Sequence, residues 1–199
     1  VLNDSHYIMG EEVKELEEKL AKYVGRKYCV TCGNGTDALT LAMRVLDVKE
    51  GDAVFVPTFT FYSSAEVISL EGATPIFVDV NETFNMDAKK LEKAIEQVKS
   101  EGKLNLKAIV AVDLFGQTAN FPEILEIANK YGLKVVEDAA QGFGGSISGK
   151  KACSFGDIST TSFFPAKPLG CYGDGGALMT DDDELACLLY TSDAADDLI

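Results

Sequence analysis

Histidine and tryptophan are almost missing from this sequence. Its 199 residues include no tryptophan and one histidine, His6, so we expect neither a Ser-His-Asp triad nor a metal centre built on several histidines. Basic residues are also scarce: 18 lysines and arginines stand against 32 aspartates and glutamates, for a formal net charge of −14. A charge of this sign and size repels phosphate backbones and anionic lipids. Neither nucleic acid nor a membrane surface is therefore an expected partner.

Long apolar runs are absent as well. No stretch approaches the roughly 20 apolar residues that cross a bilayer, and no basic start followed by an apolar segment indicates a signal peptide. The five cysteines form no regular framework, which favours reduced thiols and a cytoplasmic location. Cys29 and Cys32 have the spacing of a redox or zinc motif, but no second pair follows, so packing within a strand is the favoured interpretation.

Nucleotide fingerprints are missing too, because neither G-x-G-x-x-G nor G-x-x-x-x-G-K-[ST] occurs. Residues 187–199 resemble the translation of an adapter used to prepare sequencing libraries. We expect this tail to be read-through rather than native sequence. Residues 1–186 would then form a large domain that is incomplete at both ends.

Apolar residues recur with the period of a helix in some segments and in short unbroken runs in others, and the two kinds alternate along the chain. Helices are predicted at residues 10–24, 63–70, 87–99 and 121–131. Strands are predicted at residues 28–31, 53–56, 75–78, 106–112, 133–136 and 177–180. Residues 100–105 are expected to form a polar loop, and Lys150 and Lys151 a solvated turn. The alternation predicts an α/β fold with a mostly parallel sheet between helices.

A glycine turn follows the first predicted strand and leads into a helix. The segment runs Gly33-Asn34-Gly35-Thr36-Asp37 and continues into an apolar helical pattern. Backbone amides at a helix N-terminus, with Gly35 allowing close approach and Thr36 adding a hydroxyl, can bind a phosphate. An ordinary N-cap formed by Thr36 or Asp37 is the competing interpretation.

One lysine, Lys167, lies in an apolar and glycine-rich setting. Phe163, Phe164, Pro165 and Leu169 surround it in the sequence. A lysine wrapped in such side chains would be partly desolvated, which favours the neutral amine and allows Schiff-base chemistry. A buried structural amine is the alternative.

Other polar or aromatic residues follow predicted strands, where open α/β sheets place their ligands. Asp138 ends a buried strand, although it could instead cap the next segment, and Phe61 follows another strand, although core packing is the commoner role of such a residue. A phosphate site at Gly35 and Thr36, the ring of Phe61, the carboxylate of Asp138, the hydroxyl of Ser162 and the amine of Lys167 together meet the needs of pyridoxal 5'-phosphate.

The segments that carry these residues resemble the DegT/DnrJ/EryC1/StrS family of nucleotide-sugar aminotransferases. The resemblance lies in the segments 33–39, 56–61, 136–141 and 162–167, in matching order and spacing. It implies the type I fold of pyridoxal phosphate enzymes and a homodimer with active sites at its interface.

The same resemblance implies a role for each site residue. Lys167 would form the Schiff base, Asp138 would pair with the pyridine nitrogen and Gln141 would lie by the phenolic oxygen of the cofactor. Phe61 would stack on the ring. The phosphate would be held by Thr36 and Ser162, with Gly35 and the amide of Asp37 nearby.

The lysine segment and the glycines after it are most similar to enzymes that aminate UDP-2-acetamido-2-deoxy-3-keto-glucuronate with glutamate, for surface polysaccharides. Two alternatives remain open. Related dehydratases replace the lysine with histidine, so Lys167 favours transamination. A regulatory protein without cofactor would have no reason to keep Asp138 and Lys167 together.

Overall fold

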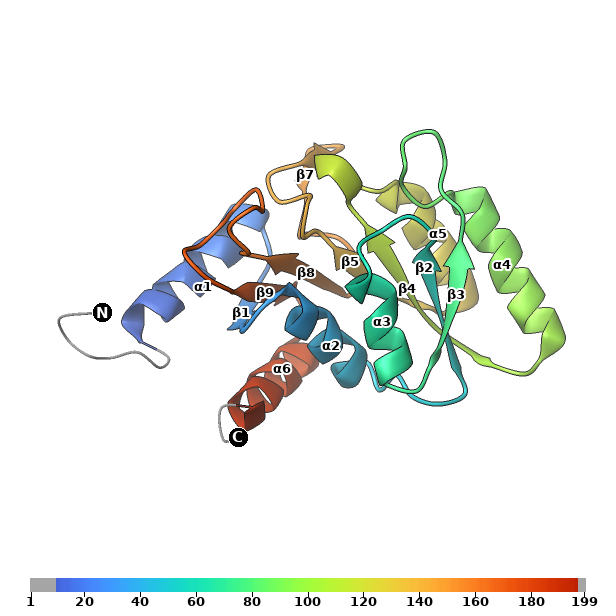
Figure 1. Ribbon diagram of the computed structural model, residues 1–199, viewed down its shortest axis with the longest axis horizontal. Coiled ribbons are helices and arrows are strands. Elements are labelled where there is room, and N and C mark those ends of the chain that lie inside the picture. Colours follow the sequence, from blue (N-terminus) through green and yellow to red (C-terminus); the bar gives the residue numbers. More distant parts are fainter. Residues whose placement is uncertain (1–9, 197–199) are drawn as a thin grey trace.

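The computed structural model describes residues 10–196, so His6 lies outside the described part of the chain. Its helices are α1 (Glu11–Val24), α2 (Gly35–Val45), α3 (Ser63–Leu70), α4 (Ala88–Glu101), the 3-10 turn η1 (Leu114–Gly116), α5 (Phe121–Tyr131) and α6 (Asp183–Asp196). Its strands are β1 (Tyr28–Cys32), β2 (Asp52–Pro57), β3 (Thr74–Val78), β4 (Asn105–Val112), β5 (Lys134–Asp138), β6 (Ser146–Ile147), β7 (Lys150–Lys151), β8 (Ile158–Ser162) and β9 (Gly176–Thr180). Figure 1 shows their arrangement.

One seven-stranded sheet, in the order β1-β9-β8-β5-β4-β2-β3, forms the centre of the molecule. The five strands from β8 to β3 pair in parallel, whereas β9 runs antiparallel to both β8 and β1. The mixed, mostly parallel sheet expected from the sequence is therefore confirmed. Because the parallel strands share one direction, the residues that follow them meet at one edge of the sheet.

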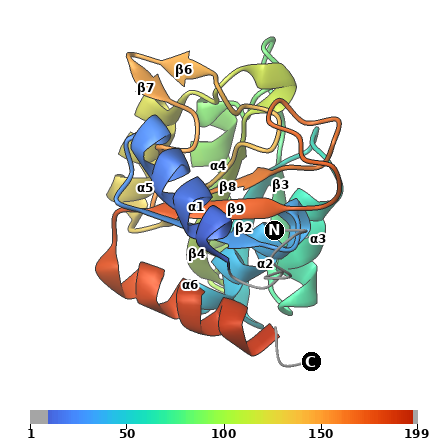
Figure 2. The ribbon, with the colours of Figure 1, turned by 90° about the vertical axis from the view of Figure 1, so that its left-hand side faces the viewer.

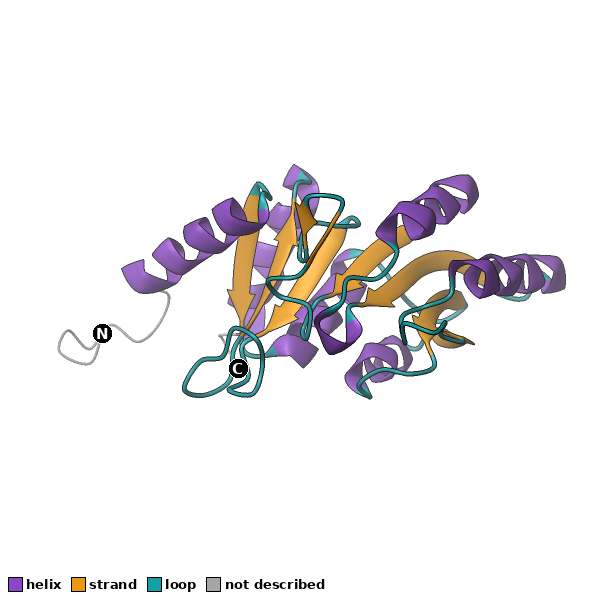
Figure 3. Ribbon diagram, turned by 90° about the horizontal axis from the view of Figure 1, so that it is seen from above, coloured by secondary structure: helices purple, strands orange, loops and turns teal. Residues whose placement is uncertain are grey.

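Helices cover both faces of this sheet (Figure 3). Successive residues of a strand point to opposite faces, and the packing follows this rule in β4: Val110 packs with α2 and α3, and Ile109 with α4 and α5. On the side of Val110, Leu189 of α6 joins the same core. Figure 2 shows α2 and α6 below strands β8 and β9, and the β6–β7 hairpin above them.

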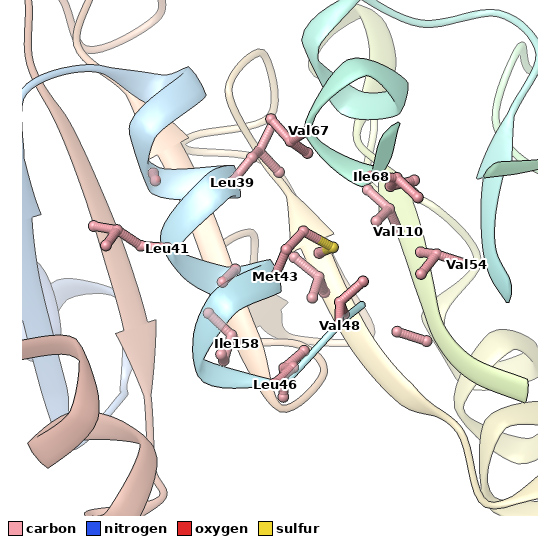
Figure 4. Close-up of a cluster of buried hydrophobic side chains, with 14 of the residues drawn as sticks. Leu39, Leu41, Met43, Leu46, Val48, Val54, Val67, Ile68, Val110 and Ile158 are labelled. Atoms are coloured by element: carbon pink, nitrogen blue, oxygen red, sulfur yellow. The ribbon is translucent and has the colours of Figure 1, made fainter. Parts of the chain in front are cut away.

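The helix α2 is central to the larger apolar core. Its Met43 is fully buried, and Figure 4 shows Leu39 and Met43 projecting from α2 toward α3 and the sheet, on the side of Val67 and Val110. This packing fixes the helix axis, and with it the direction in which the first turn of α2 points.

Several boundaries differ from the sequence-based expectation. The helix α4 continues into the predicted polar loop as far as Glu101, because Gly102 adopts the left-handed conformation (φ 63°) that ends it. The predicted turn at Lys150 and Lys151 is wrong. These two residues form β7, which pairs with β6 in a short hairpin, and a strand of two residues is too short to show a periodic pattern. Residue 186, after which we expect the adapter-derived tail to begin, lies within α6 (Asp183–Asp196), and the origin of that tail stays a prediction.

Candidate active site

A cleft of about 1000 Å³ opens at the edge where the parallel strands end. Its walls come from the first turn of α2, the loop between β2 and α3, the segments after β4 and β5, and the end of β8 with the loop that follows it. These segments are far apart in the sequence. The parallel sheet brings them together because each follows the carboxyl end of a strand or precedes a helix packed on it.

Seven of the eight residues singled out from the sequence line this cleft, namely Gly35, Thr36, Phe61, Asp138, Gln141, Ser162 and Lys167. The eighth, Asp37, is in the first turn of α2. Its backbone N–H donates to Oδ1 of Asn34 at 2.9 Å, and its carboxylate accepts from Nδ2 of Asn34 at 2.6 Å. The Asp37 amide is thus already engaged within the helix start.

Asn34 is the N-cap of α2, so the expectation that Thr36 or Asp37 caps this helix is wrong. Asparagine is a strong N-cap because its side-chain oxygen accepts from the amide three residues on. The amides of Gly35 and Thr36 have no acceptor within the helix, as in the first turn of any helix. The positive end of the helix dipole and these two N–H groups form a setting for an anion at the cleft wall.

Two glycines bring the start of α2 against the neighbouring strands. A Cβ built on Gly35 would lie 2.6 Å from Cβ of Ser162, at the end of β8. A Cβ on Gly176 would lie 2.4 Å from the backbone oxygen of Asn34. Glycine at both positions therefore allows the α2 amides and the Ser162 hydroxyl to line one part of the cleft.

Asp138 ends β5, and its side chain is buried at the floor of the cleft. Ser64 donates its hydroxyl to Oδ2 at 2.8 Å, and the Ala140 amide donates to Oδ1 at 3.2 Å. The bond from the Ala140 amide is the local cap that the sequence offered as an alternative role for Asp138. Asp138 makes this bond and also lines the cleft. Burial raises the pKa of Asp138 above its usual range, while the bonds from Ser64 and Ala140 and the charge of Lys167 act in the opposite direction.

Lys167 lies across the cleft, with its Nζ 5.8 Å from the centre of the Phe61 ring. Of the four apolar residues expected to wrap this lysine, only Phe164 lines the cleft together with it. Phe163 packs with α1 and β9 in a separate core cluster, whereas Phe164 and Leu169 are 51% and 37% exposed. Extended residues alternate in direction as the chain leaves β8, so neighbours in the sequence do not surround the lysine. The lysine side chain is half-buried and its setting is the cleft itself.

Sequence reasoning missed Ser64, the side chain that holds Asp138. Its hydroxyl also lies 2.9 Å from Oγ1 of Thr60, so a chain of hydroxyls leads from the β2–α3 loop to the buried carboxylate. No local pattern marks this serine, because its partner is 74 residues away. Phe115 was missed as well, and its amide donates to Oε1 of Gln141 at 3.2 Å.

Other candidate functions find no support in the described residues. Between residues 10 and 196, no group of three or more histidine, cysteine, aspartate or glutamate side chains could hold a metal ion. Over the same range, every helix is too short or too polar to cross a membrane. Cys29 is buried in β1 within an apolar cluster, as the packing interpretation requires.

Comparison with known proteins adds independent evidence. The model of the DegT/DnrJ/EryC1/StrS aminotransferase family matches residues 1–192. A curated relative, the UDP-2-acetamido-2-deoxy-3-oxo-D-glucuronate aminotransferase of Pseudomonas aeruginosa, is 51% identical over 187 residues, which make up 94% of this chain and 50% of that protein.

Two solved structures extend the comparison to the fold. A DegT DnrJ EryC1 StrS aminotransferase from Brucella abortus has a TM-score of 0.95 at 48% identity, and the match covers 96% of this chain and 52% of that one. The NtdA protein of Bacillus subtilis, solved with bound cofactor PMP, has a TM-score of 0.86 at 35% identity, covering 95% of this chain and 41% of that one. The chain spans about half the length of the relatives that it matches. Sequence and fold agree along nearly the whole chain, and it belongs to the DegT/DnrJ/EryC1/StrS aminotransferase family.

Proposed function

We propose that the protein carrying this chain is a pyridoxal phosphate-dependent aminotransferase that moves the amino group of glutamate to a keto-sugar nucleotide. The observation that carries the proposal is the meeting of Lys167 and Asp138 in one cleft, next to the amides of Gly35 and Thr36 at the start of α2. An amine, a buried carboxylate and an anion site are the three groups that this cofactor requires.

The residues of the cleft fit the cofactor. Its phosphate would be held by the amides of Gly35 and Thr36 and by the hydroxyls of Thr36 and Ser162. The Asp37 amide would contribute through the helix dipole, because its own hydrogen is taken by Asn34. Phe61 would cover one face of the ring, and Gln141 would lie near the phenolic oxygen. The cleft volume of about 1000 Å³ leaves room for a substrate as well.

When bound, pyridoxal phosphate supplies an electron sink for the carbanion formed at the substrate Cα. Asp138 would keep a proton on the pyridine nitrogen, because a carboxylate buried at the cleft floor stabilises a cation in contact with it. Ser64 and the Ala140 amide fix the direction of that carboxylate. Lys167 would carry the proton to and from Cα as general base and acid, with its amine held at the cleft wall near Phe61.

The proposed acceptor is UDP-2-acetamido-2-deoxy-3-keto-glucuronate, because the relative of that name is 51% identical. The product would enter the biosynthesis of surface polysaccharide in the cytoplasm. We also propose a homodimer in which each subunit completes the active site of the other. Dehydration of the sugar is the weaker alternative because Lys167 is present, and a purely regulatory role is weaker because Lys167 and Asp138 share the cleft.

The test uses the full-length protein. It should show a visible absorption band that borohydride bleaches, with the reduced label on Lys167. Lys167→Ala should lack the band, and Lys150→Ala, which changes an exposed lysine of the β6–β7 hairpin, should keep it. Absence of the band from the wild type, or a label on another lysine, would contradict the cofactor assignment.

A panel of keto-sugar nucleotides with glutamate as amino donor then tests the substrate. If the enzyme aminates another keto-sugar nucleotide but not the 3-keto-uronate, the proposed substrate is refuted and the aminotransferase activity is not. We further propose that residues 187–199 derive from adapter sequence. Amplification of the gene from its source and resequencing across codon 187 would show the native continuation.

A further inference from the structure

Two carboxyl groups contact each other in the interior, directly behind the cleft. Asp113 follows β4 and Glu137 lies within β5, and both side chains are fully buried. In the pairing of β4 with β5, Ala111 lies opposite Glu137, so Asp113, two residues further on, is directed to the same face of the sheet as Glu137. Each of the two carboxyl groups acts on the charge of the other. The proposed function uses neither group, although Glu137 is the immediate neighbour of Asp138.

Glu137 is surrounded by hydrogen-bond donors. The Cys153 amide donates to Oε1 at 2.8 Å, while the Phe155 amide and the Ser159 hydroxyl donate to Oε2 at 2.8 and 2.7 Å. The guanidinium of Arg26 lies beyond Ser159, with Nη2 3.4 Å from the serine oxygen. A carboxylate that accepts three such bonds is stabilised as the anion.

Asp113 has the opposite kind of surroundings. The Ala119 amide donates to Oδ1 at 2.9 Å, and no donor in the described part of the chain reaches the buried Oδ2. The backbone of Gly142 covers the side chain so closely that a Cβ there would lie 2.6 Å from Oδ2. Two buried carboxyl groups in contact cannot both ionise, and the one with fewer donors keeps the proton.

We propose that Asp113 is held as the neutral acid, that its Oδ2–H donates to Glu137, and that this shared proton positions Asp138 for its role in the cleft. Asp113 acts on Asp138 through the backbone, because its amide donates to the Asp138 carbonyl oxygen at 2.9 Å. Its side chain also lies against the turn at Gly142, next to Gln141 of the cleft wall. Asp113 is thus a positioning residue and does not itself line the cleft.

The neutral state of Asp113 also limits the negative charge behind the site. The charged or titratable groups that face Asp113 are Glu137, Asp138 and the thiol of Cys153, and this thiol faces Glu137 as well. Burial, followed by the charge of Glu137, raises the pKa of Asp113 well above its usual range, in agreement with the geometry. A second full charge beside Asp138 would draw a proton onto that residue and weaken it as partner of a cation.

The shared proton can be observed directly, without cofactor. Infrared spectra of the full-length apoprotein at neutral pH should contain the carbonyl stretch of a protonated carboxylic acid, shifted in D2O. Asp113→Asn should abolish this band and Asp138→Asn should keep it, which assigns it to the Asp113–Glu137 pair. Absence of the band from the wild type, or its persistence in Asp113→Asn, would overturn the proposal. This readout holds whether or not the protein is an aminotransferase.

The positioning role rests on the proposed function and has its own readout. The amide side chain of the Asp113→Asn variant keeps a donor for Glu137 and an acceptor for Ala119. This variant should therefore leave pyridoxal phosphate affinity, and the pH profile of the visible band, unchanged within about twofold. Asp113→Ala removes the Asp113 donor from the Glu137 carboxylate and the acceptor from the Ala119 amide, and it should weaken the affinity at least about tenfold. Equal losses in both variants would refute the positioning role. If the alanine variant does not fold, a loss of affinity or a shifted pH profile in Asp113→Asn alone would refute it.

Discussion

Replacement of Gly35 with alanine would push the first turn of α2 away from the end of β8. The added Cβ would meet Cβ of Ser162 at 2.6 Å, whereas ordinary contact begins at 3.4 Å, so the two elements must separate by roughly 0.8 Å. Such overpacking costs about 1–3 kcal/mol, and the better helix propensity of alanine offsets less than ~1 kcal/mol of it. We expect the free energy of unfolding to fall by about 1–2 kcal/mol.

Urea denaturation of the full-length protein measures this loss, with Gly173→Ala as the matched control. Gly173 lies in the loop between β8 and β9, which borders the cleft. A Cβ built on Gly173 would have no atom within 4 Å. The control should therefore unfold at nearly the same urea concentration as the wild type. If Gly35→Ala and Gly173→Ala unfold alike, the close approach of α2 to β8 is wrong.

A second substitution separates packing from phosphate binding. Ser162→Gly, added to Gly35→Ala, removes the Cβ and Oγ that the new methyl group meets. Much of the overpacking cost should disappear in the double variant. Pyridoxal phosphate affinity should stay low, because the Ser162 hydroxyl is lost as well. Recovery of both stability and affinity would show that Ser162 does not hold the phosphate.

Three further predictions concern the floor of the cleft and the core. Ser64→Ala removes a donor to a buried carboxylate and should lower the free energy of unfolding by about 1–3 kcal/mol; Ser69→Ala, an exposed change in the same helix, should change it by less than ~0.5 kcal/mol. Because burial raises the folded-state pKa of Asp138, its contribution to apoprotein stability is greatest below about pH 4 and is lost as the pH rises through that pKa. A pH series of unfolding should show this decline weakened in Asp138→Asn, and a steeper decline would contradict the sign. Phe121→Ala removes a fully buried ring stacked on Phe155 at 4.5 Å, and calorimetry should show a loss of about 3–5 kcal/mol.

Elements are predicted well from the sequence where a local signal, such as a glycine that ends a helix, marks their bounds. The bounds of α5 match the prediction because Gly132 adopts the left-handed conformation that ends the helix. The same signal was misjudged at α4, where polar residues suggested a loop although Gly102 marks the true end. The β6–β7 hairpin was missed because two-residue strands are too short for any periodic pattern.

Some residues of the candidate site could be predicted from local sequence, and others could not. Lys167 and Asp138 could be found because Asp138 ends a strand and Lys167 follows one, each within a motif, and strand ends converge at one edge of the sheet. Ser64 and the Asp113–Glu137 contact could not be found, since each joins residues that the chain separates and only packing brings together. The surroundings of Lys167 were misjudged for the same reason: nearness in sequence is not nearness in space.

The position of β9 has a consequence for the order in which the molecule can fold. This strand lies between β1 and β8, pairing Tyr28 with Thr180 on one side and Ser159 with Met179 on the other. During synthesis, β1 leaves the ribosome well before β9, its neighbour in the described sheet, because more than a hundred residues separate them. Contacts of such long sequence separation form slowly. The strands next to Lys167, namely β1, β9 and β8, should therefore pair last. The strands next to Phe61, namely β2, β3 and β4, should already have formed.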